Sequence, residues 1–549
     1  MTISDSLLAA FIVAPLLASG LLMMLRRSRI FQSVTLLLVL IASLGGAAVM
    51  IRLTADGSVY AHSVALWPGG ISIPLVADMF AALMLVATGI ITIACIAFAL
   101  AAGFAQSPYF APLVLVMVTG VNGALLTADI FNFFVFLEVM LLPAYGLYIL
   151  SPKGATRTPR SRVAGLRLFL TVNLFTSTVF LAGVGFIYGV VGTVNIAELA
   201  GLAAENDALA LATAICLFAL AIKSSIVPTH GWLARSYPLT TPAITALFSG
   251  IHTKVANYAI YRLYAVVFDG DETYLWIGVV FFSLTMLVGV LGAVGEHTTR
   301  SILAFHMTSQ IGYIMLGVAL FTELGLTAGI FYLVHHMIVK ASLFLSTGAL
   351  EVTHGTGRLG ALPPMGKREP LLALAFMAAA LSLAGLPPFS GFVGKLALIV
   401  AAAEVGQWIA VAVMVIVSLF TLLSMLKIWS GVFWDLPWAT VGRRTQPAAV
   451  PEGNHATGVS GDRKRDGSTS AVALDGESEA ALVLADPVEK VESAEELPKV
   501  KLSLVLPSVA LALITLSIGM VAEPLLAWAE TAAHGLQNTT PYVEAVLTP

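Results

Sequence analysis

Apolar segments of about 20 residues recur along the whole chain and are separated by short polar stretches. A segment of that length can cross the hydrocarbon core of a bilayer as an α-helix. The pattern predicts an all-α integral membrane fold with about fourteen spans. Their approximate ranges are 6–25, 32–52, 77–102, 110–128, 130–150, 165–190, 208–230, 240–267, 274–296, 300–321, 325–350, 370–402, 408–434 and 502–529.

The composition supports the membrane assignment. Of the 549 residues, 58% are hydrophobic and 11% are charged, and the mean hydropathy is +0.93. Ordinary soluble domains are about 25% charged, so a soluble globular protein is excluded. The two cysteines, Cys95 and Cys216, both fall inside predicted spans. We find no nucleotide-binding loop, haem ligand pair, cysteine cluster or metal-ligand spacing, so we expect no cofactor, no metal and no nucleic acid.

Basic residues in the short loops predict the orientation. In membrane proteins such residues concentrate on the cytoplasmic side. The loops after spans 1, 5, 7, 9 and 11 are basic, whereas two of the alternate loops are acidic, so we expect both termini to lie outside a bacterial cell membrane. The basic residues are Arg26, Arg27, Arg29, Lys153, Arg157, Arg160, Arg162, Arg167, Arg235, Arg300, Arg358, Lys367 and Arg368.

One region departs from the apolar pattern. Residues 436–500 are rich in Pro, Gly, Ser and mixed charge, and they lack a sustained apolar period. Such a segment cannot bury enough surface to fold alone, so we expect a disordered cytoplasmic linker. It would divide the chain into helices 1–13 within 1–435, with a core over about 110–434, and a final helix with an outward tail within 501–549. Its role is either a tolerated insertion or the docking of a partner.

Ionisable residues interrupt several of the predicted spans. Each costs about 2.5 to 3.5 kcal/mol at the centre of a bilayer, so a series of them requires a partner or a use. A lysine near a helix end, such as Lys395, can instead extend to the headgroups, and Glu138 can instead form a purely structural ion pair. The whole series favours an ion path; it comprises Glu138, Lys223, Lys254, Lys340 and Lys395.

Prolines mark breaks in two of these charged spans. Pro228 follows Lys223, and Pro387 with Pro388 precedes Lys395. A proline lacks the N–H that a helix needs, and in a membrane the freed carbonyls must be satisfied inside the protein or by water. Interrupted spans therefore tend to line hydrated cavities.

Histidines supply further groups that can carry protons. His336 and Lys340 are four residues apart and share one helical face, as do His306 and Gln310. Histidine titrates near neutral pH and is the usual relay element. The alternative for each is a buried histidine that is simply hydrogen-bonded.

Several stretches together resemble a known family. They include FNFFVFLEVMLLPAYGLYIL, LTVNLFTSTVFLAGVGFIYG, SILAFHMTSQIGYIMLGVAL and AGLPPFSGFVGK. They are similar to the antiporter-like subunits shared by respiratory complex I, membrane-bound hydrogenases and Mrp-type multisubunit Na+/H+ antiporters, above all the D subunits of the last. The resemblance implies fourteen helices with two inverted five-helix repeats, each containing a broken helix.

The resemblance also implies roles for the interior charges. Glu138 matches the acid that pairs with the lysine at Lys223, and Lys254 matches the next lysine. The relay of the eleventh helix matches His336 and Lys340, and Lys395 matches the lysine beyond the second break. At about 4 Å and an effective dielectric constant of about 20, a Glu–Lys pair attracts by about 4 kcal/mol. Movement of Glu138 relative to Lys223 could therefore load or unload a proton.

We expect the chain to be the proton-translocating subunit of a Na+/H+ antiporter that is driven by the proton-motive force. It would be a transporter subunit rather than an enzyme, with the lipid bilayer and other antiporter subunits as partners and with H+ and Na+ as ions. One alternative is a proton-pumping subunit in the membrane arm of a redox complex. Another is a structural scaffold, in which single neutralisations of the interior charges would spare activity.

Overall fold

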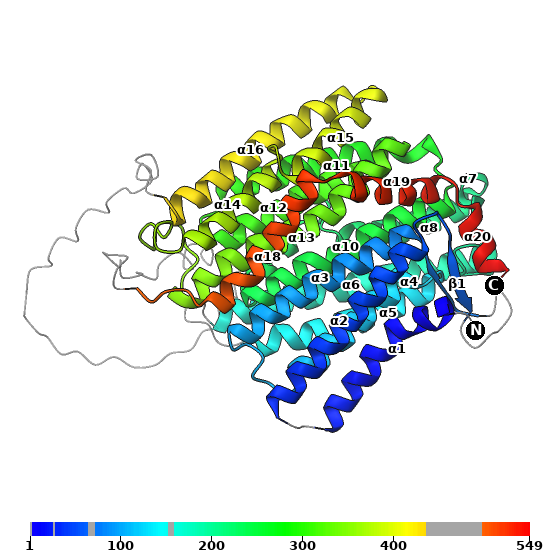
Figure 1. Ribbon diagram of the computed structural model, residues 1–549. Helices are drawn as coiled ribbons and strands as arrows, with labels where there is room; N and C mark the ends of the chain where they lie inside the picture. The colour runs from blue at the N-terminus through cyan, green and yellow to red at the C-terminus, as the bar shows by residue number, and fades with distance from the viewer. Residues whose placement is uncertain (1–2, 26–27, 64–71, 152–158, 435–496, 549) are drawn as a thin grey trace, which may run out of the picture.

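The computed structural model describes residues 3–25, 28–63, 72–151, 159–434 and 497–548, which form a bundle of long, roughly aligned helices (Figure 1). Four of the basic loop residues lie outside the described residues, as does most of the predicted linker. These are Arg26, Arg27, Lys153, Arg157 and residues 436–496 of the linker. Nothing in the structure therefore tests the prediction that the linker is disordered.

The described residues up to Val191 form six long helices and one short hairpin. The sequence did not predict the hairpin, because its strands have only four residues each and lie between two strongly apolar spans. The strands pair antiparallel, with Tyr60 opposite Ala77. The elements are α1 (Ile3–Met24), α2 (Arg29–Leu53), β1 (Tyr60–Ser63), β2 (Pro74–Ala77), α3 (Met79–Ala101), α4 (Phe110–Leu126), α5 (Ile130–Leu150) and α6 (Pro159–Val191).

From Leu202 onward, the described residues alternate long helices with short ones. Its elements are α7 (Leu202–Glu205), α8 (Asp207–Lys223), α9 (Gly231–Ser236), η2 (Tyr237–Leu239), α10 (Pro242–Val267), η3 (Glu272–Tyr274), α11 (Leu275–Gly295), α12 (Thr299–Leu320), α13 (Glu323–His354), α14 (Pro370–Ala384), α15 (Ser390–Glu404), α16 (Trp408–Val432), α18 (Leu502–Met520), α19 (Glu523–Gln537) and α20 (Thr540–Leu547). Within the described residues, ten helices are long and apolar enough to cross a membrane. The predicted helical membrane fold is thus confirmed, while the count of fourteen spans and the inverted repeats remain predictions.

Helix α13 forms the centre of the bundle. It packs against α3, α10, α12, α14, α15, α18 and α19, and its long apolar window is completely buried. The outer helices α1 and α2 instead expose large apolar side chains, including Leu17, Ile30 and Leu38. The polar residues of α13 are therefore held inside protein, whereas α1 and α2 present surfaces suited to lipid.

Two spans are interrupted beside the prolines. Helix α8 ends at Lys223 and α9 begins at Gly231, with Pro228 between them. Helix α14 ends at Ala384, where Gly385 caps it with a φ of +85°, and α15 begins at Ser390. A left-handed conformation of this kind is readily adopted by glycine and closes the helix end.

The C-terminal region differs from its prediction. A single helix over 502–529 is wrong, because α18 ends at Met520 and α19 begins at Glu523. Pro524 lies in the first turn of α19, where its missing N–H costs no helical hydrogen bond, so the proline begins a new helix. Helix α19 then packs against α13 and α3.

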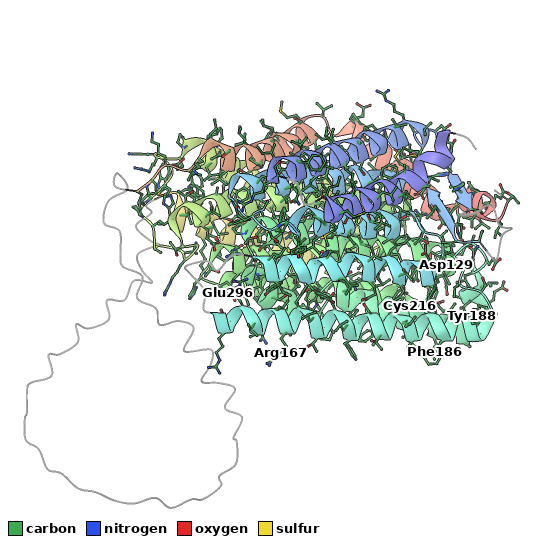
Figure 2. All side chains as sticks on the ribbon, turned by 90° about the horizontal axis from the view of Figure 1, so that it is seen from below. Asp129, Arg167, Phe186, Tyr188, Cys216 and Glu296 are labelled. Carbon is green, nitrogen blue, oxygen red and sulfur yellow. The ribbon has the colours of Figure 1, made fainter. Side chains whose placement is uncertain are left out.

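Both termini lie at the same end of the bundle, and α18 begins at the opposite end (Figure 1). Seen from below, Arg167 and Glu296 lie toward the end where α18 begins, whereas Asp129 and Tyr188 lie toward the termini (Figure 2). The basic side chain of Arg167 and the termini are thus at opposite ends.

Candidate functional site

The predicted site residues come from six helices and are almost all enclosed. Glu138 lies on α5 and is half-buried. The others are buried in the bundle: Lys223 on α8, Lys254 on α10, His306 on α12, His336 and Lys340 on α13, and Lys395 on α15. Buried lysines without a carboxylate partner are costly to keep charged, so these side chains are suited to giving up and regaining a proton.

Glu138 and Lys223 are not in contact. Glu138 Oε1 and Lys223 Nζ are both buried and have no hydrogen-bond partner among the described residues, and no ion pair joins them. The carboxylate still acts electrostatically on Lys223. The pairing implied by the resemblance is therefore absent as a contact, because a motif specifies the residue types but not the side-chain conformations that set their separation.

His252 is the next neighbour of Lys223. It lies on α10 with its ring stacked on Phe248, at 4.4 Å between centroids, and Lys223 acts on it electrostatically. Neither ring nitrogen has a partner in the described part of the chain. The sequence pattern does not single out this residue, because Lys223 is distant from it in the chain and the two are brought close only by folding.

Lys254 belongs to a second group of site residues, together with Lys340 and His336. Its Nζ donates to Thr253 Oγ1 at 3.0 Å, while Lys340 Nζ donates to the Leu303 carbonyl at 2.8 Å. The two lysines interact electrostatically, and both act on His336. Both ring nitrogens of His336 lack a partner within the described residues. The three groups form one electrostatically connected cluster between α10 and α13.

His306 and Lys395 continue this cluster. His306 Nε2 lies 2.5 Å from Ser424 Oγ, and both Lys340 and Lys395 act electrostatically on the ring. Lys395 Nζ donates to the Ala384 carbonyl and to Ser418 Oγ, each at 3.2 Å. Lys395 is thus held inside the protein and does not extend to the headgroups.

His306 and Gln310 lie on the same helix, α12, but are not hydrogen-bonded to each other; Gln310 Oε1 accepts a hydrogen bond from Tyr332. His335, which the sequence pattern did not single out, is also buried, and its Nδ1 lies 2.8 Å from Ser390 Oγ. The spacing of residues along the chain does not show that His335, as well as its neighbour His336, has a role.

Two buried ion pairs were also missed. Arg262 Nη2 donates to Asp78 Oδ2 at 2.6 Å, and Arg300 pairs with Glu351. Arg300, which we assigned to a basic loop, is therefore buried and neutralised. In each pair the two charges compensate each other, unlike the lysines described above, so the arginines are suited to structure rather than to proton exchange.

The described residues contain no group of three or more His, Cys, Asp or Glu side chains placed to hold a metal ion. Their chemistry is that of acid and base groups. One carboxyl group, four lysines and several histidines follow one another from α5 to α15.

Comparison with known proteins shows which family the chain resembles. Residues 127–421 match the family described as NADH:quinone oxidoreductase/Mrp antiporter, TM. The chain is 39% identical to the D subunit of the Na(+)/H(+) antiporter of Alkalihalophilus pseudofirmus, with 72% of this chain and 80% of the relative covered. It is 31% identical to the N subunit of the NADH-quinone oxidoreductase of Desulforudis audaxviator, with 74% and 82% covered. A chain in the structure of the Mrp complex from Dietzia sp. DQ12-45-1b is 52% identical, with a TM-score of 0.87 and 100% of both chains covered.

Proposed function

Because the chain belongs to the NADH:quinone oxidoreductase/Mrp antiporter membrane family, we propose that it is the proton-translocating subunit of a multisubunit Na+/H+ antiporter. Relatives at 39% and 30% identity are named as the D subunits of Na(+)/H(+) antiporters, and the similar chain at 52% identity belongs to an Mrp complex. These names support a transporter over an enzyme. The proton-motive force would drive it as a secondary active antiporter.

The observation that carries the proposal is a succession of ionisable groups, all buried except the half-buried Glu138, none of which forms an ion pair within the described residues. We define the proton axis as Glu138, Lys223, Lys254, His336, Lys340, His306 and Lys395, with His252 as an added member. Consecutive groups interact electrostatically from Glu138 to His252 and from Lys254 to Lys395. A purely structural role would leave several buried lysines unexplained.

The physical basis of transfer is the competition between burial and charge. Burial disfavours a protonated lysine, whereas a nearby ionised carboxylate favours it. An approach of Glu138 to Lys223 would therefore help Lys223 to take up a proton, and a withdrawal would release it. A proton on Lys223 would in turn disfavour a second positive charge nearby, so loading would be communicated along the axis.

The orientation and the partners complete the proposal. The termini would face outward and the basic loops inward, which agrees with the place of Arg167 toward the end of the bundle opposite the termini. The other antiporter subunits would be the protein partners, and H+ and Na+ the ions. The segment 436–500 would remain a cytoplasmic linker before the final membrane-spanning region over 501–549.

A second candidate function is a proton pump in the membrane arm of a redox complex. The 31% identity to a subunit of an NADH-quinone oxidoreductase favours it. Both functions use the same buried charges, so the partners distinguish them. Co-purification with small membrane subunits of an antiporter supports the first function, whereas co-purification with iron-sulfur and flavin subunits supports the second.

The transport test uses everted vesicles containing the complete complex. Glu138→Gln and Lys223→Ala should each abolish proton-driven Na+ movement while the complex still assembles. Glu205→Gln is the matched control, because Glu205 is an exposed acid on α7 and should transport normally. Normal transport by both axis variants would refute the proposed function.

A further inference from the structure

His335 occupies the second helix break without belonging to the proton axis defined above. It lies on α13, beside the break between α14 and α15, and is completely buried. Its Nδ1 is 2.8 Å from Ser390 Oγ in the first turn of α15. Ser390 Oγ is in turn 3.3 Å from Ser382 Oγ near the end of α14. Three polar side chains thus connect α13 to both sides of the break.

The backbone around this connection leaves no room for another side chain. A Cβ atom added to Gly391 would lie 1.7 Å from the carbonyl oxygen of Ser382 and 3.1 Å from His335 Nε2. The two helix ends therefore meet almost backbone to backbone, and the ring of His335 covers the place where they meet. A small displacement of α15 would break these contacts.

The position of Lys395 depends on the same contacts. Lys395 lies on α15, while the Ala384 carbonyl that accepts its hydrogen bond ends α14. The carbonyls at a helix end carry partial negative charge and stabilise a positive group. Any change in the fit of α15 against α14 therefore changes how well the protonated Lys395 is held.

We propose that His335 is a positioning residue, whose hydrogen bond to Ser390 fixes α15 against α14 and so places Lys395 at the end of α14. It acts through this hydrogen bond and carries no proton itself. This inference rests on the proposed function, because it assigns His335 a task in the terminal part of the proton axis.

The first break, between α8 and α9, is stabilised by different side chains from those at the second. Trp232 Nε1 donates to the Ile222 carbonyl at 2.9 Å, and Ser225 Oγ lies 3.3 Å from Thr308 Oγ1. Hydroxyls and an indole therefore make these contacts around the first break, whereas a histidine contributes at the second. The contact between His335 and Ser390 can be tested without disturbing the first break.

The test compares five variants in everted vesicles that contain the whole complex, at equal amounts of assembled chain. His335→Ala and Ser390→Ala should each reduce proton-driven Na+ movement about tenfold, the order of effect of one lost buried hydrogen bond. The double variant should be no worse than either single one. His335→Asn should retain activity within about twofold, because its amide reaches the place of Nδ1, whereas His335→Gln should not.

Two results would overturn this inference. One is that His335→Asn is as inactive as His335→Ala while Ser390→Ala is normal, which would make the ring itself a proton carrier. The other is normal transport by both His335→Ala and Ser390→Ala. Ser390→Ala removes a single hydroxyl, so it decides the question if His335→Ala fails to assemble. Lys395→Ala is measured in parallel: normal transport there would refute the proposed proton axis, whereas its loss together with normal His335 and Ser390 variants would refute only the positioning role.

Discussion

Lys395 Nζ lies 3.2 Å from the carbonyl oxygen of Ala384, so the side chain of one half-helix is bound by the end of the other. The centroid of the Tyr313 ring lies 4.7 Å from the same nitrogen. Together these contacts favour a positive charge, while burial opposes it. This balance between opposing effects is what a group that exchanges protons requires.

A permanent positive charge at position 395 should not be sufficient for proton transport. Arginine keeps the positive charge but cannot be deprotonated in proteins, so Lys395→Arg should reduce proton transport at least about tenfold. The measurement is the quenching of a pH-sensitive dye in vesicles after a Na+ pulse. Lys427→Arg is the control, because Lys427 donates to the carbonyls of Val294 and Glu296 outside the axis. Full activity of Lys395→Arg would contradict a proton-exchanging role for this residue.

The buried pair of Arg262 and Asp78 should support stability rather than transport. Asp78→Asn keeps a side chain that can cap α3, as Asp78 Oδ1 does by accepting from the Ala81 amide at 3.0 Å. It leaves Arg262 without its counter-charge, at an expected cost of about 3 to 5 kcal/mol. Thermal unfolding of the detergent-solubilised complex should therefore occur at a lower temperature.

A double variant distinguishes the effect of an unpaired charge from the effect of altered side-chain shape. Asp78→Asn combined with Arg262→Gln removes both charges and should recover much of the lost stability. If Asp78→Asn alone unfolds like the unmodified chain, the pair is not a structural element.

Much of the site could be predicted from the sequence because charges stand out in apolar spans. Lys223, Lys254, Lys340 and Lys395 all fall inside predicted spans, and the structure buries each of them, including Lys395, which could instead have extended to the headgroups. The proximity of His252 to Lys223 could not be predicted, because it depends on how α8 and α10 pack. The separation of Glu138 from Lys223 depends on side-chain conformation, which a sequence motif does not specify.

The same limit applies to the fold. Long apolar helices follow from hydropathy, and the two proline breaks follow from the missing N–H groups. Arg262 and Asp78 are 184 positions apart in the chain, so their pairing could not be predicted from the sequence around either residue. The end of α18 at Met520 was hidden by the apolar sequence that continues beyond it.

Gly519 provides a test of the packing at the second break. A Cβ atom there would lie 2.4 Å from the carbonyl oxygen of Pro388 and 2.5 Å from the amide nitrogen of Ser390. Gly519→Ala should therefore push α18 away from the break, with a loss of stability of about 1 to 3 kcal/mol.

The control for this substitution is Gly45→Ala. An added Cβ at Gly45 meets no atom within 4 Å, so this helical position should be unaffected or slightly stabilised. Melting temperature and Na+ transport are measured for both variants. Equal behaviour of the two would show that the close approach at Gly519 has no consequence.

Lys254 tests the central claim most directly, because this buried lysine on α10 acts electrostatically on both His336 and Lys340 of α13. The measurement is simultaneous H+ and Na+ flux in proteoliposomes containing the whole complex, with Lys254→Ala compared with the unmodified chain at equal assembly. The account predicts that both fluxes fall by at least about a hundredfold, since loss of a required acid–base group typically costs 10²- to 10⁴-fold. Both fluxes at the unmodified rate would contradict proton transfer through this axis.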